Sequence, residues 1–331
     1  MAHPTPLQSL IGGLTIPVAA HELLLLNGNV FGISGFIHRA VKGNIDGTAG
    51  VAGLILGGVL VGQLESAGPA ALSLTLPQVM LSGFLVGLGT KLANGCTSGH
   101  MICGISRFSI RSIAATVSFF ITGVITTQLV HGDLPAVGSA DWSLSATSAK
   151  LLALQAVPFT YTAIMYALVC GNTKKLKPKA DGKEVPNPPH HVLRAATYLA
   201  TGFQFALALR LSNLSEASRV LSFLILPFHR GFDPSLAFLA GGALSVGILL
   251  YHYARGNERP CLGGKWSIPR RGKVDARLII GSAIFGVGWG LAGICPGPAL
   301  VNLGRALGVG GSNLTPYAGW FASMVLGGLL V

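Results

Sequence analysis

The sequence predicts an all-α polytopic membrane protein, and its composition supports this in three ways. The chain of 331 residues is 50% hydrophobic and only 10% charged, whereas soluble domains carry about 25% charged residues. Its mean hydropathy is +0.61. Stretches without any Asp, Glu, Lys or Arg are long enough to cross a bilayer as helices of about 20 residues; they cover 66–90, 151–173, 278–304 and 306–331. This composition excludes a soluble enzyme.

The apolar runs predict spanning helices and several shorter segments. The expected spanning helices are 7–26, 47–64, 112–130, 151–171, 194–211, 235–253 and 316–331. The N-terminal residues lack the basic region of a secretory signal, so we expect the first of these helices to remain in the mature protein. Pieces that are too short to cross alone lie at 69–81, 84–94, 217–228, 283–293 and 299–307. Since Gly and Pro interrupt them, we expect half-helices or re-entrant segments.

A basic, proline-rich segment divides the chain into two membrane halves. Residues 172–191 contain five lysines and four prolines, a composition typical of an extended, solvent-facing linker. The halves are therefore expected at 1–171 and 192–331.

The two halves contain one matching motif. Residues 83–99 align with residues 282–298 at a constant offset of 199, without a gap. The alignment places a Gly-x-Gly pair, a Leu-Ala pair and the cysteines Cys96 and Cys295 in register. Such self-similarity indicates an internal repeat.

The basic residues indicate how the chain crosses the membrane. The connections at 39–42, 107–111, 174–183 and 255–277 are rich in Lys and Arg, whereas 65–78 and 131–148 contain neither. The positive-inside rule then makes the basic connections cytoplasmic, where they serve as orientation signals and contact anionic lipids rather than nucleic acid. The two cysteine segments thus cross the membrane in opposite directions, which is the signature of an inverted-topology repeat.

The strongest functional signal is a pair of predicted helix breaks, at 94–100 and 293–298. Backbone that leaves a helix within the membrane survives where protein or a watery cavity satisfies it, and the ends of half-helices attract anions. A single buried cysteine is usually inert packing. Because Cys96 and Cys295 occupy both breaks in register, we expect their thiols to face a pathway. Cys103 is a candidate for the same axis or for packing.

Membrane-depth charges favour an anionic substrate. Basic candidates outnumber acids there, which argues against coupling through carboxylates. Lys91 and Arg305 lie within a few turns of the cysteines and are expected on the pathway, whereas Arg194 and Arg210 are expected to snorkel to lipid. The odd number of cysteines predicts no disulfide framework, with Cys170 structural and Cys261 an accessible thiol.

The motif GCTSGH-x-x-CG-x-S-R within 83–109 resembles the signature of the YeeE/YedE family of sulfur-transport membrane proteins. Residues 27–35 resemble the opening segment of one component of that family. Residues 232–236 and 286–299 resemble its partner component. The resemblance therefore implies that both paired components are fused in one chain.

The resemblance also implies a fold and a role for the cysteines. It implies an hourglass-shaped protein of inverted repeats that takes up thiosulfate past central thiols through S–H···S hydrogen bonds. Cys96 and Cys295 match the two central motifs. A third family cysteine is absent from the first re-entrant segment, which carries Val30, Phe31 and Ser34 instead, and this departure bears on the substrate more than on the fold. The candidate pathway residues are Cys96, Cys295, Cys103, Thr97, Ser98, Asn94, His100, Lys91, Arg305 and Ser34.

Two classes of function remain open at this point. The preferred one is a permease or channel of the plasma (inner) membrane for thiosulfate, with no cofactor, no nucleic-acid partner and a cytoplasmic sulfurtransferase as a candidate partner. Sulfite or a selenium analogue would follow the same route. The alternative is a membrane-bound sulfurtransferase-like enzyme that forms a persulfide on Cys96 or Cys103, activated by Lys91 or His100. Against the enzyme, neither a separate general base nor a sulfur-accepting domain is evident in the sequence.

Overall fold

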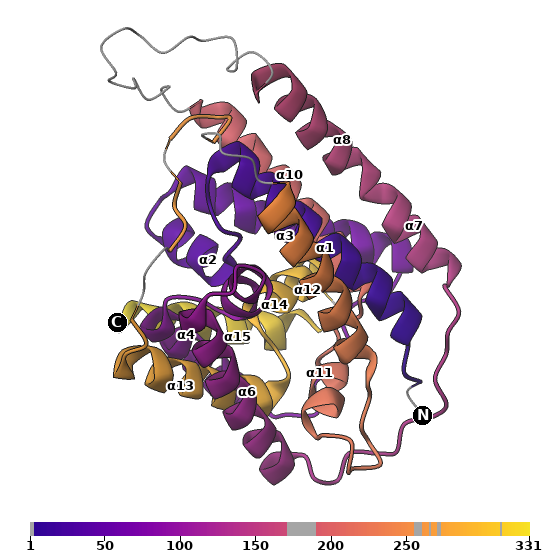
Figure 1. Cartoon of the computed structure of the whole chain (residues 1–331). Coiled ribbons are helices and arrows are strands. Elements are labelled where there is room, and N and C mark those ends of the chain that lie inside the picture. The colour runs from indigo at the N-terminus through magenta and orange to yellow at the C-terminus, as the bar shows by residue number, and fades with distance from the viewer. Residues whose placement is uncertain (1–2, 171–189, 255–259, 265, 270–272, 312) are drawn as a thin grey trace, which may run out of the picture.

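The computed structural model describes residues 3–170, 190–254, 260–264, 266–269, 273–311 and 313–331. Within these ranges the chain is helical, with no strand beyond one isolated bridge between Asn29 and Ser267. Eight helical stretches in the described part are long and apolar enough to cross a membrane. The all-α polytopic membrane fold is therefore confirmed (Figure 1). The predicted linker falls almost wholly outside the described residues.

The described part of the first half contains eight α-helices and two π-helical segments. Its elements are α1 (Pro6–Asn27), α2 (Ile33–Val41), α3 (Ile45–Glu65), α4 (Leu76–Ala93), the π-helical η1 (Ser98–Ile102), α5 (Cys103–Ile105), α6 (Ile110–Val130), α7 (Ala146–Leu154), α8 (Ala156–Met165) and the π-helical η2 (Tyr166–Cys170). The second half contains α10 (His191–Leu211), α11 (Ala217–Leu224), α12 (Ser235–Tyr253), α13 (Ala276–Ala292), α14 (Pro296–Gly308) and α15 (Leu314–Leu329).

Two of the expected short segments are in fact one helix. The 18-residue α4 joins residues 76–81 of the first piece to the second piece, predicted at 84–94, whereas residues 69–75 are not helical. Gly83 does not break the helix; a side chain there would collide with the backbone of Trp320 on α15. The sequence prediction was wrong at this point because a small residue that permits close helix contact looks the same as a helix breaker.

Helices of the first half pack mainly on helices of the second half. Helix α1 packs on α12, as α10 packs on α3. Helix α4 packs on α15, as α13 packs on α6, and the pairs α1–α10 and α4–α13 are also in contact. Each half therefore forms its core largely with helices of the other half.

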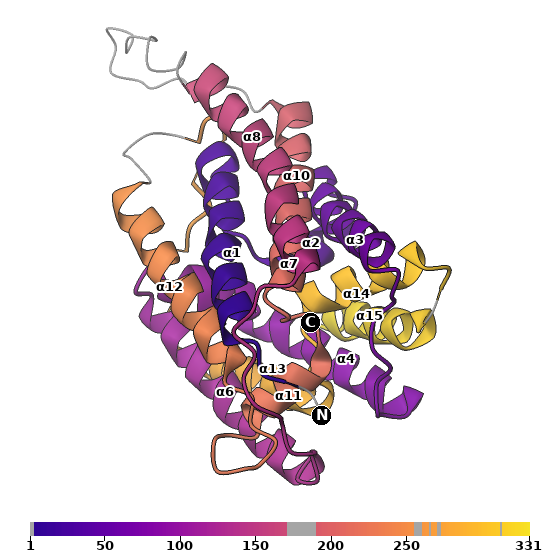
Figure 2. The same ribbon diagram turned by 90° about the vertical axis from the view of Figure 1, so that its right-hand side faces the viewer.

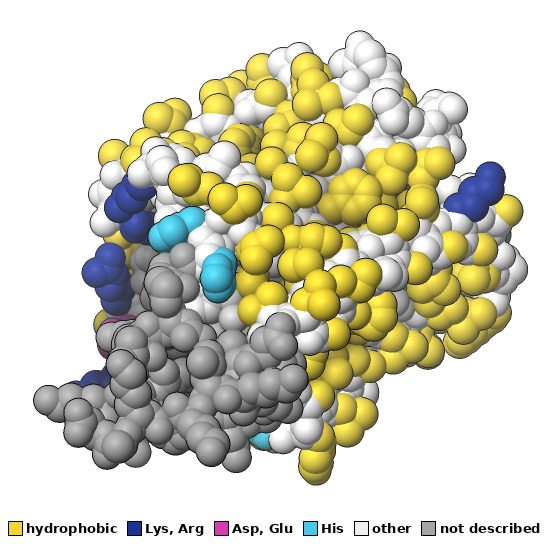
Figure 3. Space-filling view, turned by 90° about the horizontal axis from the view of Figure 1, so that it is seen from above, with side chains coloured by type: hydrophobic (Ala, Val, Ile, Leu, Met, Phe, Trp, Pro, Cys, Tyr) yellow, Lys and Arg dark blue, Asp and Glu magenta, His cyan; other side chains and the backbone are white. Residues whose placement is uncertain are grey.

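Helices α7 and α8 form a long rod on the outside of the molecule, beside α10 (Figure 2). The exposed side chains of this rod are mostly apolar, such as Val157, Phe159 and Ile164. Hydrophobic side chains are also the most widespread kind of side chain on the face seen in Figure 3, where few Lys or Arg side chains appear. Such a surface is what a lipid bilayer solvates.

The structure contains a disulfide that the cysteine count did not predict. Cys170, at the end of η2, is bonded to Cys261, and their Cα atoms are 5.1 Å apart. Cys261 is therefore a buried, bonded residue rather than an accessible thiol. Its loop is anchored on α1, because the N–H groups of Cys261 and Leu262 donate to the carbonyls of Leu25 and Leu26 (3.1 and 2.8 Å). The two cysteines are 91 residues apart, a separation that no spacing rule connects.

Two arginines that were expected to snorkel are instead engaged inside the protein. Arg194 donates to Asp46 (3.3 Å) and to the carbonyl of Gly263 (2.8 Å). Arg210 binds the carboxylates of Glu65 and Glu216. Asp46 and Glu65 lie more than 140 residues from the arginines that they bind, so the hydropathy pattern alone could not show these two pairs.

Candidate functional site

The first helix break forms where α4 ends. Asn94 follows Ala93 with a left-handed backbone (φ 56°), a conformation that asparagine tolerates better than most residues. The N–H of Gly95 then donates to the carbonyl of Thr90 (3.0 Å). This arrangement ends α4 and leads Cys96 and Thr97 into η1. The predicted break at 94–100 is thus a real interruption of the helix.

The second break is built by different residues. Helix α13 ends at Gly293, whose φ of +68° favours glycine, and a side chain there would collide with the carbonyl of Ala217. Cys295 is the extended N-cap residue of α14. Pro296 occupies the first helical position, where its missing N–H costs nothing. The chain therefore turns sharply at the cysteine in this half too.

The two breaks meet at their cysteines. Thr97, from the first break, donates its hydroxyl hydrogen to the sulfur of Cys295 in the second (3.7 Å). The sulfur of Cys96 lies 3.3 Å from the hydroxyl of Ser98, which also accepts the N–H of Ile33 on α2 (3.2 Å). Cys96 is 1% and Cys295 is 3% exposed. Both thiols are thus enclosed, and each has a hydroxyl neighbour.

Cys103 lies close to the same centre. Its thiol donates to the carbonyl of Phe31 (3.7 Å), which precedes α2. Cys103 and Phe31 also line a small apolar cavity beside α1 and α12. The structure therefore places a third thiol against residues 27–35, which contain no cysteine of their own.

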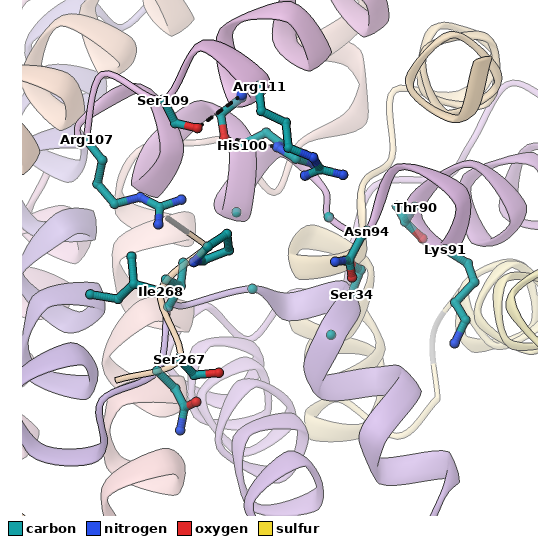
Figure 4. A pocket seen from close by; sticks show the side chains of 18 of the residues that line it. Ser34, Thr90, Lys91, Asn94, His100, Arg107, Ser109, Arg111, Ser267 and Ile268 are labelled. Atoms are coloured by element: carbon teal, nitrogen blue, oxygen red, sulfur yellow. Dashed lines mark hydrogen bonds between the residues drawn. The ribbon is translucent and has the colours of Figure 1, made fainter. Parts of the chain in front are cut away.

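A large vestibule opens above the first break. It has a volume of about 1250 Å³ and is lined by residues from both halves. Of the predicted pathway residues, Ser34, Lys91, Asn94 and His100 lie in its wall (Figure 4). The cysteines are absent from this described lining, which reaches Gly95 and Gly99 on either side of the buried Cys96 segment. The vestibule therefore ends just short of the thiols.

The wall of the vestibule is strongly cationic. Its described part contains six Lys and Arg side chains besides Lys91, namely Arg39, Lys42, Arg107, Arg111, Lys273 and Arg277, against one acid, Asp275. Asp275 accepts the N–H of Leu278 as the cap of α13 (2.8 Å). These bases come from the connections that were interpreted as orientation signals and lipid contacts. The sequence showed that these bases lie in the connections between helices, but only the fold brings them together around one cavity.

The two histidines that line the described part of the vestibule add little positive charge and do not act on the thiols. His38 lies on α2, outside the eight candidate spans, and burial, followed by the charges of Lys91 and Lys42, lowers its pKa to about 4. His100 is buried, with Nε2 3.3 Å from the carbonyl of Ala93 and Nδ1 3.2 Å from the hydroxyl of Ser112. Both ring nitrogens of His100 are thus used to hold the break. Neither nitrogen is left to activate a thiol.

Arg305 does not join the other predicted residues. It is 2% exposed and binds the carboxylates of Glu65 and Glu216, each at 2.9 Å. Glu65 ends α3, whereas Lys42, which precedes α3, lines the vestibule. A helix of 21 residues is about 30 Å long, so Arg305 lies near the opposite end of α3 from the vestibule.

Comparisons with known proteins point to one group of transporters. The family model described as sulphur transport matches residues 7–126, and a family of unknown function (DUF6691) matches residues 192–330. A probable transporter from Xylella fastidiosa strain 9a5c is 42% identical over 119 residues, which are 36% of this chain and 81% of the relative. A second one, from strain Temecula1 / ATCC 700964, is 42% identical over 120 residues, or 35% and 89% of the two chains. No solved structure matches the chain.

The matches agree with the apolar helices and the paired breaks. A matched relative is covered over most of its own length by one part of this chain, and the two family models lie in the two halves. The protein is an integral, multi-pass membrane transporter. It belongs to the YeeE/YedE-like family of sulfur transporters, with two domains joined in one chain.

Proposed function

We propose that the protein is a permease or channel that carries thiosulfate across the inner (plasma) membrane into the cytoplasm. The observation that supports this most is the meeting of the two helix breaks, where Cys96 and Cys295 lie buried beside the hydroxyls of Ser98 and Thr97. The cationic vestibule ends directly above them. A soft, thiol-lined centre below an anion-attracting cavity suits a sulfur anion.

The chemistry of thiosulfate matches these two environments. The ion is doubly charged, with three oxygens at one end and a soft sulfur at the other. Cations and unpaired N–H groups at helix ends attract the oxygens, while thiols are weak donors that suit the sulfur. Fast passage requires weak sites in series rather than one tight site, and Cys96, Cys295 and Cys103 supply such a series.

The internal repeat is part of the proposal. We infer that residues 1–171 and 192–331 are inverted halves of an hourglass-shaped structure with re-entrant segments α2 and α11. The packing of helices across the two halves supports this, since the pair α1–α12 corresponds to α10–α3 and the pair α4–α15 corresponds to α13–α6. In such folds the substrate passes at the interface of the two halves.

A cytoplasmic partner is consistent with the size of the vestibule. Its volume of about 1250 Å³ exceeds the range of about 300–1,000 Å³ that is usual for small-ligand pockets. We propose that a soluble sulfurtransferase receives the anion there. The membrane-bound enzyme has less support, because both ring nitrogens of His100 are engaged away from the cysteines.

Uptake of labelled thiosulfate into proteoliposomes tests the function. We expect Cys96→Ala and Cys295→Ala to abolish uptake, whereas the double variant Cys170→Ser/Cys261→Ser, which removes the disulfide outside the pathway, keeps it. Normal uptake by both pathway variants at equal protein amounts would end the thiol mechanism.

Competition with unlabelled anions tests the substrate. Weak hydrogen bonds of this kind are worth about 0.5–1 kcal/mol each, so two in series predict a roughly tenfold preference for thiosulfate over sulfate. Sulfite and selenium analogues are compared in the same assay. Sulfur retained on a cysteine after washing, detected by mass spectrometry, would favour the enzyme instead.

A further inference from the structure

Two side chains in the vestibule wall carry hydrogen-bond donors without a partner. The hydroxyl of Ser34 has no partner, although the residue is only 1% exposed. Arg39, one turn later on α2, has a buried Nη2 that is also without a partner. Both residues line the vestibule. Since buried polar atoms are nearly always hydrogen-bonded, two orphan donors on one short helix indicate a place for an acceptor.

The backbone of α2 adds further donors at the same point. The helix has nine residues and begins after Gly32. The N–H of Ile33 donates to Ser98, and the N–H of Phe36 donates to the carbonyl of Gly32. The N–H groups of Ser34 and Gly35 belong to the first turn, which has no intrahelical acceptors. The positive end of the helix dipole therefore coincides with the orphan hydroxyl.

Glycines keep this point open. A Cβ atom added to Gly32 or Gly99 would meet no heavy atom within 4 Å, and one added to Gly35 would meet only Nη1 of Arg39, at 3.8 Å. All three glycines line the vestibule. The space in front of the first turn of α2 is thus free of protein, and the guanidinium group of Arg39 lies at its edge.

We propose that the first turn of α2, with the Ser34 hydroxyl and the Arg39 guanidinium, binds the oxygens of a tetrahedral sulfur oxyanion at the floor of the vestibule. The choice of sulfur anion rests on the proposed function. Ser98 contacts both Ile33 and the sulfur of Cys96, so one side chain separates this oxyanion site from the first thiol. Lys91 stands in the same wall and adds positive charge (Figure 4).

Equilibrium binding of radiolabelled sulfate and thiosulfate to the purified full chain tests the site. Wild-type protein is expected to bind both ions. Ser34→Ala should weaken the binding of both by about tenfold, because a hydrogen bond to a charged group is lost. Ser34→Thr, which keeps the hydroxyl, should retain it. Gly35→Leu should abolish binding by filling the open space while leaving the fold intact.

Matched controls separate this site from the thiol mechanism. Ser118→Ala removes a hydroxyl that donates to the carbonyl of Ala114 within α6 (2.9 Å) and should change nothing. Cys96→Ala should keep sulfate binding and lose only the preference for thiosulfate. If Cys96→Ala transports normally, the thiol mechanism fails but the oxyanion site stands. Unchanged binding of both ions by Ser34→Ala and Gly35→Leu, or no binding by wild type, would overturn the site.

Discussion

The hydroxyl of Thr97 determines how the thiol of Cys295 can be used. Because Thr97 donates to the sulfur, the sulfur accepts there and its own hydrogen remains free for another acceptor. Thr97→Val removes the donor at nearly constant volume and should reduce thiosulfate uptake about two- to tenfold, the value of one hydrogen bond. Thr97→Ser should restore it. Equal KM and maximal rate for Thr97→Val and wild type in proteoliposomes would contradict this role.

Arg305 provides a second test at the level of single residues. It binds two partly buried carboxylates that Arg210 also binds, so its loss should cost less than the about 3–5 kcal/mol of breaking a buried pair from one side. Arg305→Met should still lower the melting temperature in detergent, while uptake per folded molecule changes little. Lys150→Met, at an exposed position on α7, is the control. If Arg305→Met is as stable as wild type but does not transport, Arg305 acts on the substrate pathway and its role is not structural.

The sequence predicted single residues well where the signal was local. Cys96 and Cys295, which share a register in the sequence, do lie at two helix breaks that meet, and Asn94 ends α4 as its helix-breaking tendency suggests. Arg305 could not be placed, because Glu65 and Glu216 reach it from distant segments. The bases of the vestibule and the Cys170–Cys261 pair depend in the same way on tertiary contacts.

At the level of helices, glycines act mainly as contact points. A side chain at Gly87 on α4 would collide with the backbone of Met324 on α15, and one at Gly58 on α3 with that of Val301 on α14. In membranes such small residues allow helices to approach closely. This explains why α4 is continuous where a broken segment was expected, and why the nine-residue α2 escaped prediction: it is too short to stand out in hydropathy.

The close α4–α15 contact leads to a prediction about stability. Gly87→Leu should destabilise the protein by more than the usual 1–3 kcal/mol of an overpacked core, since backbone cannot move aside as a side chain can. Gly241→Leu on α12, where an added Cβ meets nothing within 4 Å, should fold normally. Thermal unfolding in detergent compares the two. Similar melting temperatures would show that α4 and α15 tolerate separation.

For the whole molecule, the packing of helices from one half on helices of the other predicts that the two halves assemble without a covalent link. Two chains split within 172–191 should co-purify when expressed together, because α1 needs α12 and α10 needs α3. Each half expressed alone should be degraded or aggregate. Uptake by the reassembled halves measures how well they pair, and failure to co-purify under reducing conditions would contradict this.

The Cys170–Cys261 bond closes part of the chain into a covalent ring. The ring contains the linker region together with α10, α11 and α12, so a single cut in the linker would open the loop without releasing a fragment, and a non-reducing gel would still show one band. The bond also ties the end of η2 to the segment after α12, with the two Cα atoms 5.1 Å apart. While the bond is intact, a transport movement cannot pull these two points apart. Helices that move during transport must therefore tilt about Cys170 and Cys261, which stay together.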